Sequence, residues 1–283
     1  MSRVNLMIEG QEGVTWPQWV ALARAAEDAK LEGLFRSDHL TSIVRGEPNG
    51  ALEAWSTLAA LAAVTTKLRL GTMVTPVTFR RAGILAKLVT TVDQISDGRA
   101  ELGLGAGWFE AEHLEHGLAF PPQKDRLDEL DRQLVEIERQ WTTVYPQPVQ
   151  RPRPRVIIGG TAKPRTVRAA VRHADEYNTP WPSVDEARER KRALDDAGGG
   201  HLVFSASIGV VVGRDEDEAR ERVTQFRHVT GGEPPQLSGT VEQVVERLRA
   251  YEAVGVQRFM LQHLVHEDVE MVAVLGEVAA GLG

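Results

Sequence analysis

The chain has 283 residues, and its 33 lysines and arginines against 40 aspartates and glutamates leave a formal net charge of −7, with no cysteine. Without cysteine there is no disulfide, thiolate nucleophile or iron–sulfur cluster, and a negative net charge argues against a nucleic-acid partner. No apolar run reaches the ~18 to 20 residues that span a bilayer, and Glu9 and Glu12 interrupt the segment where a signal peptide would be apolar. We therefore expect a cytoplasmic protein.

Short apolar runs rich in β-branched residues alternate along the chain with longer segments of helical period. The runs predict eight strands at residues 4–8, 33–36, 68–74, 100–104, 155–158, 176–179, 203–212 and 258–262. The segments predict helices at 16–31, 53–66, 83–95, 127–142, 164–173, 184–197, 216–228, 241–253 and 268–282. This order predicts an α/β fold, a closed (β/α)8 TIM barrel, with residues 1–283 as a single domain.

Two segments are longer than one strand–helix unit requires. Residues 108–154 follow the fourth strand and are rich first in charge and then in proline, and residues 213–254 follow the seventh strand. In a barrel, such insertions usually build the rim of the active site or a contact between subunits.

Chemistry in this fold lies where strands end, and the end of the second strand carries Asp38 and His39. An imidazole beside a carboxylate can donate or accept a proton near neutral pH. The pair therefore predicts a catalytic function, and the competing interpretation is a loop aspartate that caps a turn beside a solvated histidine.

Glycines follow the fourth and fifth strands. Gly159, Gly160 and Thr161 precede a helix that begins near Pro164, so free backbone N–H groups at its positive end predict a phosphate site, although a plain tight turn is also compatible. The glycines of residues 103–107 do not match the dinucleotide fingerprint in either register. They favour close approach of the backbone to a large, flat ligand instead.

A metal site has little support. His113 and His116 are spaced i, i+3 on a probable helix behind Glu110, but the chain has one such Glu-x-x-His motif, and the remaining histidines have no companion ligands at suitable spacing. We expect no metal.

The runs at residues 53–80 and 93–108 strongly resemble the bacterial luciferase-like flavin and deazaflavin oxidoreductases, in the branch that uses the deazaflavin coenzyme F420. The resemblance extends nearly end to end, through residues 9–13, 36–39, 156–160, 174–178 and 260–263.

The resemblance implies a tricyclic ring bound at the barrel mouth against the bulged end of the third strand, near Thr72, Met73 and Val74. A non-prolyl cis peptide is common there in the family, and here it would be the 72–73 or the 73–74 bond. By the same resemblance, Asp38 and His39 would contact the ring edge or the substrate. The ring or the ribityl chain would lie by Gly105, Ala106 and Gly107. The phosphate would bind at Gly159, Gly160 and Thr161.

Two features limit what the resemblance implies. The sugar-phosphate dehydrogenases of the branch carry a glutamate directly after the glycines of strand four, where this chain has Trp108, so glucose 6-phosphate is disfavoured as substrate. The two unlike subunits of the light-emitting members also find no counterpart in a single chain of this length.

The sequence therefore predicts hydride transfer between F420 and an organic small molecule. His39 would act as the proton donor or polarising group, and Asp38 would orient His39 or the ring. One alternative is an FMN-dependent luciferase-like monooxygenase, and another is a non-redox barrel that binds a phosphorylated ligand. Segment 53–66 has no charged residue after Glu53, so we expect a homodimer that associates through this helix.

Overall fold

The structure is a computed structural model that describes residues 3–46 and 49–283. Parallel strands close into a barrel because β1 pairs with both β2 and β10, and β10 also pairs with β8. The closed barrel has eight strands: β1 (Arg3–Ile8), β2 (Gly33–Arg36), β3 (Arg69–Thr72), β5 (Ala100–Gly105), β6 (Arg155–Gly159), β7 (Glu176–Pro180), β8 (Val203–Gly213) and β10 (Arg258–His263). The predicted TIM barrel is confirmed.

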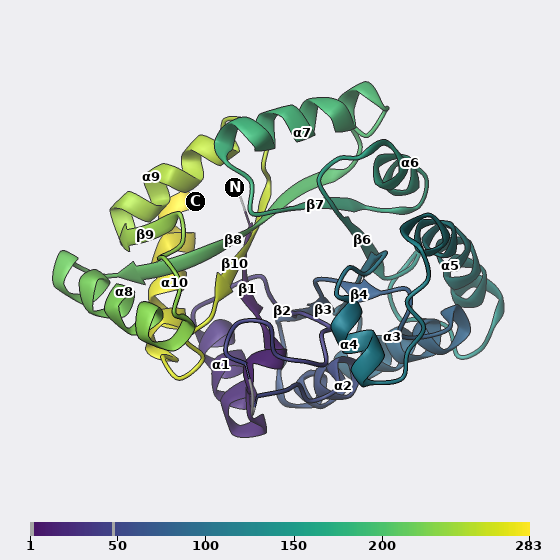
Figure 1. Ribbon diagram of the computed structural model, residues 1–283, viewed down its shortest axis with the longest axis horizontal. Coiled ribbons are helices and arrows are strands. Elements are labelled where there is room, and N and C mark those ends of the chain that lie inside the picture. The colour runs from purple at the N-terminus through teal and green to yellow at the C-terminus, as the bar shows by residue number, and fades with distance from the viewer. Residues whose placement is uncertain (1–2, 47–48) are drawn as a thin grey trace.

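Helices surround the strands, as Figure 1 shows. They are α1 (Trp16–Asp28), α2 (Ala54–Val64), α3 (Ala82–Ser96), α4 (Glu110–Glu115), α5 (Gln123–Thr143), α6 (Pro164–His173), α7 (Val184–Asp196), α8 (Glu216–Thr230), α9 (Val241–Glu252) and α10 (Glu270–Leu282). The helices other than α4 bury apolar residues against the outer face of the barrel, as Trp19 and Leu22 do from α1. No helix among the described residues is long and apolar enough to cross a membrane.

Two short strands differ from the prediction. The third predicted strand, residues 68–74, ends at Thr72, and the chain pairs with β5 again as β4 (Thr75–Pro76) after a cis peptide bond between Met73 and Val74. The other is β9 (Leu237–Thr240), which pairs with the outer half of β8. Its sequence Leu-Ser-Gly-Thr has no apolar alternation, so the pattern gave no sign of it.

The base of the barrel is closed by an ion network at the strand beginnings. Arg258 on β10 donates to Glu101 on β5 and to Glu176 on β7, both at 2.7 Å, and all three side chains are fully buried. Burial alone would raise the pKa of Glu101, but the charges of Arg258 and Arg69 outweigh it and lower that pKa. Strands from opposite sides of the barrel are thereby joined across its interior.

Above this network, Met7, Phe35, Ile157 and Met260 pack together from four different strands. Because successive residues of a strand point to opposite faces, these side chains fill the interior while their neighbours pack against the helices. With the base and middle filled, the carboxyl end of the barrel is the end left for a site.

Candidate functional site

The predicted residues lie together at the carboxyl ends of neighbouring strands. Asp38 and His39 lie one residue beyond the end of β2, Thr72 ends β3, Gly105 ends β5 and Gly159 ends β6. Register places Arg36 beside Thr72, Pro76 beside Gly105 and Leu104 beside Ile158, so these ends share one edge of the barrel.

Asp38 is a buried carboxylate with three donors. Arg80 donates to both of its oxygens, at 2.6 and 3.1 Å, and the hydroxyl of Thr75 donates at 2.7 Å. Burial raises the pKa of Asp38, while Arg80 and Thr75 oppose that rise. Arg80 also pairs with Glu53 at the start of α2, so Asp38 belongs to an ion cluster that fixes the loop after β2.

His39 is held by a different carboxylate. Its Nδ1 lies 2.8 Å from Oε1 of Glu112, whose other oxygen accepts the backbone N–H of Leu40 at 3.0 Å. An ionised carboxylate only accepts, so Nδ1 carries the proton. Asp38 makes no hydrogen bond to His39 in the described part of the chain, because Arg80 and Thr75 engage its oxygens. Any effect of Asp38 on His39 therefore passes through the loop that carries both.

The pairing changes the acidity of His39. Burial alone would lower its pKa, but the hydrogen bond and charge of Glu112 outweigh burial and raise the pKa above its ordinary value. Nε2 makes no hydrogen bond with the described part of the chain. His39 can therefore hold a proton near neutral pH and offer it from Nε2.

Exposed aromatic side chains follow two of the strands, and one of them lies beside this imidazole. Trp108, which is 62% exposed, lies edge-on to His39 at 5.5 Å between ring centroids and stacks on Phe109 at 5.3 Å. Trp181, 60% exposed after β7, has a φ of +40°, and its indole donates to Gln262 at 3.2 Å. A bulky residue rarely adopts such a backbone angle, and backbone strain of this kind clusters at functional sites.

Val74 lies against two glycines at the ends of neighbouring strands. A Cβ added to Gly105 would lie 2.7 Å from Cγ2 of Val74, and one added to Gly159 would lie 3.4 Å from its Cγ1. Val74 therefore lies against the backbone of β5 and β6; a side chain at Gly105 would collide with it, whereas a methyl at Gly159 would make an ordinary contact. Ala106 is half-buried, and Gly107 has a φ of +78°, which turns the chain away from β5 toward α4.

The loop after β6 departs from the prediction in one respect. The N–H of Gly160 donates to the carbonyl of Asn178 at 3.0 Å, so it is not free for a phosphate. The N–H of Ala162 donates to the hydroxyl of Tyr177 at 2.9 Å. Thr161 is exposed, and no side chain caps the first turn of α6, so this turn still presents donors at the positive end of the helix.

The histidines of α4 have structural partners. His113 is buried, with Nδ1 2.7 Å from the carbonyl of Phe109 and Nε2 2.7 Å from the hydroxyl of Thr78. His116 lies 3.3 Å from the hydroxyl of Thr41. Among residues 3–46 and 49–283, no group of three or more acidic or histidine side chains is arranged to hold a metal ion.

The sequence did not predict that Thr75 and Arg80 bind Asp38, or that Glu112 binds His39. For Glu112 the sequence offers one indication, because it lies in segment 108–154, one of the two long insertions that usually build the rim of a barrel or a subunit contact. The structure confirms that this segment reaches the mouth, since α4 carries the carboxylate that binds His39.

Comparison with protein families gives a match to the luciferase-like monooxygenase family over residues 3–236. An uncharacterized protein of Mycobacterium tuberculosis is 31% identical over 151 residues, which is 47% of this chain and 52% of that protein. The chain thus matches about half the length of that relative.

Longer matches include proteins named for two different cofactors. An F420-dependent glucose-6-phosphate dehydrogenase of Nakamurella multipartita is 27% identical over 87% of this chain and 78% of its own. An FMNH2-dependent dimethylsulfone monooxygenase of Pseudomonas putida is 27% identical over 65% of this chain and 55% of its own.

Solved structures share the fold. An F420-dependent secondary alcohol dehydrogenase has a TM-score of 0.80 at 16% identity, covering 100% of this chain and 99% of its own. The oxygenating constituent of 3,6-diketocamphane monooxygenase from Pseudomonas putida, in complex with FMN, has a TM-score of 0.81 at 16% identity, covering 99% and 98%. At such identity the likeness establishes the barrel and not the cofactor.

Proposed function

Because the chain belongs to the luciferase-like monooxygenase family, we propose that it transfers a hydride between coenzyme F420 and an organic substrate at the barrel mouth. The observation that carries this proposal is the pair formed by His39 and Glu112. It places a proton on an imidazole beside the exposed indole of Trp108, where a substrate can reach it. Family membership itself makes the chain a luciferase-like oxidoreductase and disfavours a non-redox barrel.

The residues at the mouth fit a planar cofactor. Val74, packed on Gly105 and Gly159, offers a flat apolar surface against which a tricyclic ring could lie, with Thr72 and Met73 on the same strand end. Gly107 and Ala106 would pass beside the ring or its ribityl chain. Thr161 and the first turn of α6, rather than the N–H of Gly160, would hold the phosphate.

When bound, F420 supplies the C5 carbon that gives or takes the hydride. The chain supplies the proton that balances it: reduction of a carbonyl needs one proton at the oxygen, and oxidation of an alcohol releases one. His39 gives that proton from Nε2 in reduction and accepts it in oxidation, while Glu112 holds the ring and keeps the proton on Nδ1. Asp38 acts through the loop, because its bonds to Arg80 and Thr75 fix the backbone that carries His39.

The surroundings of His39 also bear on the substrate. Trp108 occupies the place where the sugar-phosphate dehydrogenases carry a glutamate, and it presents an indole face rather than a charge. We therefore propose an uncharged organic substrate that stacks on an aromatic ring, and not glucose 6-phosphate.

A titration of the purified protein with oxidised and reduced F420, and separately with oxidised and reduced FMN, tests the cofactor. We expect saturable quenching of F420 fluorescence at stoichiometric ratio, and much weaker binding of FMN. Tight binding of FMN without binding of F420 would make the chain a flavin monooxygenase of the same family, as the FMNH2-dependent relative suggests. Binding of neither cofactor would refute both assignments.

A further inference from the structure

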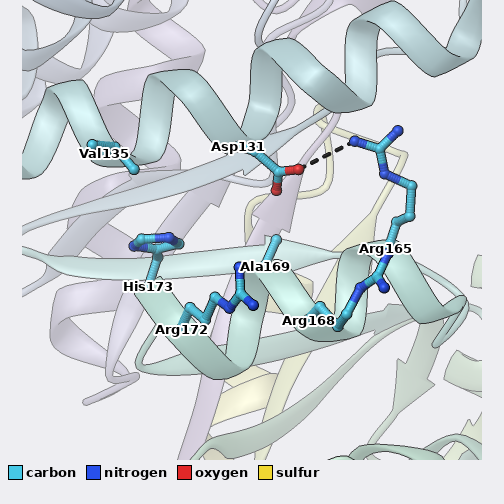
Figure 2. Close-up of a pocket in the computed structure, with 7 residues that line it drawn as sticks. All are labelled: Asp131, Val135, Arg165, Arg168, Ala169, Arg172 and His173. Atoms are coloured by element: carbon cyan, nitrogen blue, oxygen red, sulfur yellow. Dashed lines mark hydrogen bonds and ion pairs between the residues drawn. The ribbon is translucent and has the colours of Figure 1, made fainter.

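A cavity of about 370 Å³ lies between α5 and α6 on the outer flank of the barrel, away from the mouth (Figure 2). Asp131 and Val135 line it from α5, and Arg168, Arg172 and His173 line it from α6, with Arg165 and Ala169 completing the wall. Its volume falls within the range of pockets that hold small ligands. We call this cavity the flank groove.

The arginines of α6 form one stripe. Arg165, Arg168 and Arg172 are spaced i, i+3 and i+7, so they lie on the same helix face over roughly 10 Å of its axis. Arg165 forms ion pairs with two aspartates of α5, Asp128 at 2.6 Å and Asp131 at 3.1 Å. Arg168 and Arg172 are exposed and make no ion pair or hydrogen bond with the described residues.

His173 also lines the groove. Its Nδ1 is buried and has no hydrogen-bond partner among residues 3–46 and 49–283, and the nearest carboxylate oxygen, on Glu138, is 3.6 Å away. A buried polar atom without a partner loses its hydrogen bond to water and gains none in return. His173 lines the groove, so a ligand bound there would lie beside its ring.

Solvated arginines are common on helices, but three observations argue against that simple interpretation here. Like charges one turn apart destabilise a helix. Carboxylates on α5 neutralise Arg165 and leave Arg168 and Arg172 unpaired, in a chain whose net charge is −7. The unpaired charges also border a cavity whose lining includes His173, with a buried Nδ1 that lacks a hydrogen bond.

We propose that the flank groove binds a small polyanion, a linear oligophosphate or a polycarboxylate. One anionic group lies at Arg168 and the next lies between Arg172 and His173. Guanidinium groups suit both ligands, since their planar forks donate to two oxygens at once. The site does not depend on the cofactor proposed for the mouth.

Calorimetric titration of the full chain with inorganic tripolyphosphate, and separately with the peptide Glu-Glu-Glu, tests the proposal at constant ionic strength. The variant Arg168→Glu with Arg172→Glu reverses both unpaired charges. The matched control is Arg24→Glu with Arg192→Glu, which makes the same change in net charge at two exposed arginines of α1 and α7.

We expect at least one probe to bind saturably, roughly tenfold or more weakly to the groove variant, and unchanged to the control. Affinity should fall as salt is added, because exposed charges are screened. Binding of tripolyphosphate alone would identify a phosphate ligand, and binding of the peptide alone a carboxylate ligand. The proposal is overturned if neither probe saturates at millimolar concentration, or if both variants lose affinity equally. F420 binding should be the same in all three proteins, so failure here is distinguishable from failure of the proposed function.

Discussion

His39 is the side chain on which the proposed chemistry depends, and its surroundings decide how it should be tested. Truncation to alanine would leave the buried carboxylate of Glu112 without its imidazole partner, so lost activity could reflect a shifted loop. His39→Asn is the sharper change, because the amide can still donate to Glu112 while nothing replaces Nε2.

We expect His39→Asn to lower turnover by about 10² to 10⁴, the usual contribution of a positioned acid or base, with little change in melting temperature. Steady-state rates and a thermal melt of the same sample measure both quantities. Unchanged turnover with an identified substrate would remove His39 from the mechanism.

Glu112 controls the pH at which His39 is protonated. Glu112→Gln leaves one acceptor oxygen for two donors, Nδ1 of His39 and the N–H of Leu40, and removes the charge that raises the pKa of His39, so that pKa should fall. Carbonyl reduction needs the protonated imidazole. Its rate is therefore highest below the pKa of His39 and falls as the pH rises through that pKa. We therefore expect the alkaline limb of the kcat profile to move to lower pH in the variant, with kcat at acidic pH retained. An alkaline limb at the wild-type pH would show that Glu112 does not act through His39.

At the scale of elements, the end of β6 carries two adjacent glycines with different surroundings. A Cβ on Gly159 would meet Val74 at 3.4 Å, an ordinary contact, whereas a Cβ on Gly160 would lie 2.8 Å from the hydroxyl of Tyr177. That hydroxyl accepts the N–H of Ala162 and so holds the turn before α6.

We expect Gly159→Ala to weaken F420 binding while the melting temperature stays near that of the wild type, because the added methyl lies on the proposed ring surface. Gly160→Ala should lower the melting temperature by displacing Tyr177. Fluorescence titration and thermal melts of the two variants check this contrast. If Gly159→Ala bound F420 as the wild type does, the cofactor would have to lie elsewhere.

Most elements could be predicted because their cause is local. The strand of residues 33–36 and the helix of residues 164–173 match β2 and α6 residue for residue, since apolar period and a proline at the helix start are visible in the sequence. β9 could not be predicted because its stability comes from pairing with β8, and four residues of Leu-Ser-Gly-Thr carry no period of their own.

The partners within the site could not be predicted for the same reason. Glu112 lies 73 residues from His39, and Arg80 lies 42 residues from Asp38. Because Asp38 and His39 are adjacent in the sequence, Asp38 was the expected partner of the imidazole. In the folded barrel, the carboxylate of Glu112 on α4 binds it instead. The occupied N–H of Gly160 likewise depends on Asn178 of the neighbouring strand.

At the scale of the whole molecule, α2 and α3 carry several exposed apolar side chains. Ala63 and Val64 are exposed on α2, and Ile84 and Ile95 are exposed on α3, against which α2 packs. Ala59 is half-buried on the same helix. Apolar patches of this kind commonly mark a contact between proteins, and small alanines allow close approach of helices.

We therefore expect a homodimer whose subunits meet through α2 and α3. Ala63→Arg would place an unpaired charge in that contact and should shift the protein to monomer, while Ala63→Ser, which adds no charge, should leave it dimeric. Ala59→Arg should act in the same direction. Light scattering at micromolar concentration measures the mass. A dimer that tolerates both arginines would place the contact elsewhere, and a monomeric wild type would end the proposal.

The central claim is hydride transfer with F420 at the mouth of the barrel, and anaerobic turnover tests it most directly. The oxidation of reduced F420 would be followed with a panel of uncharged ketones and aldehydes, and the reduction of F420 with the corresponding alcohols. We predict that at least one pair exchanges a hydride without oxygen in the wild type, and that His39→Asn abolishes most of this rate while retaining F420 binding. Turnover that requires both reduced FMN and oxygen, with none from F420 under any of these conditions, would contradict the account.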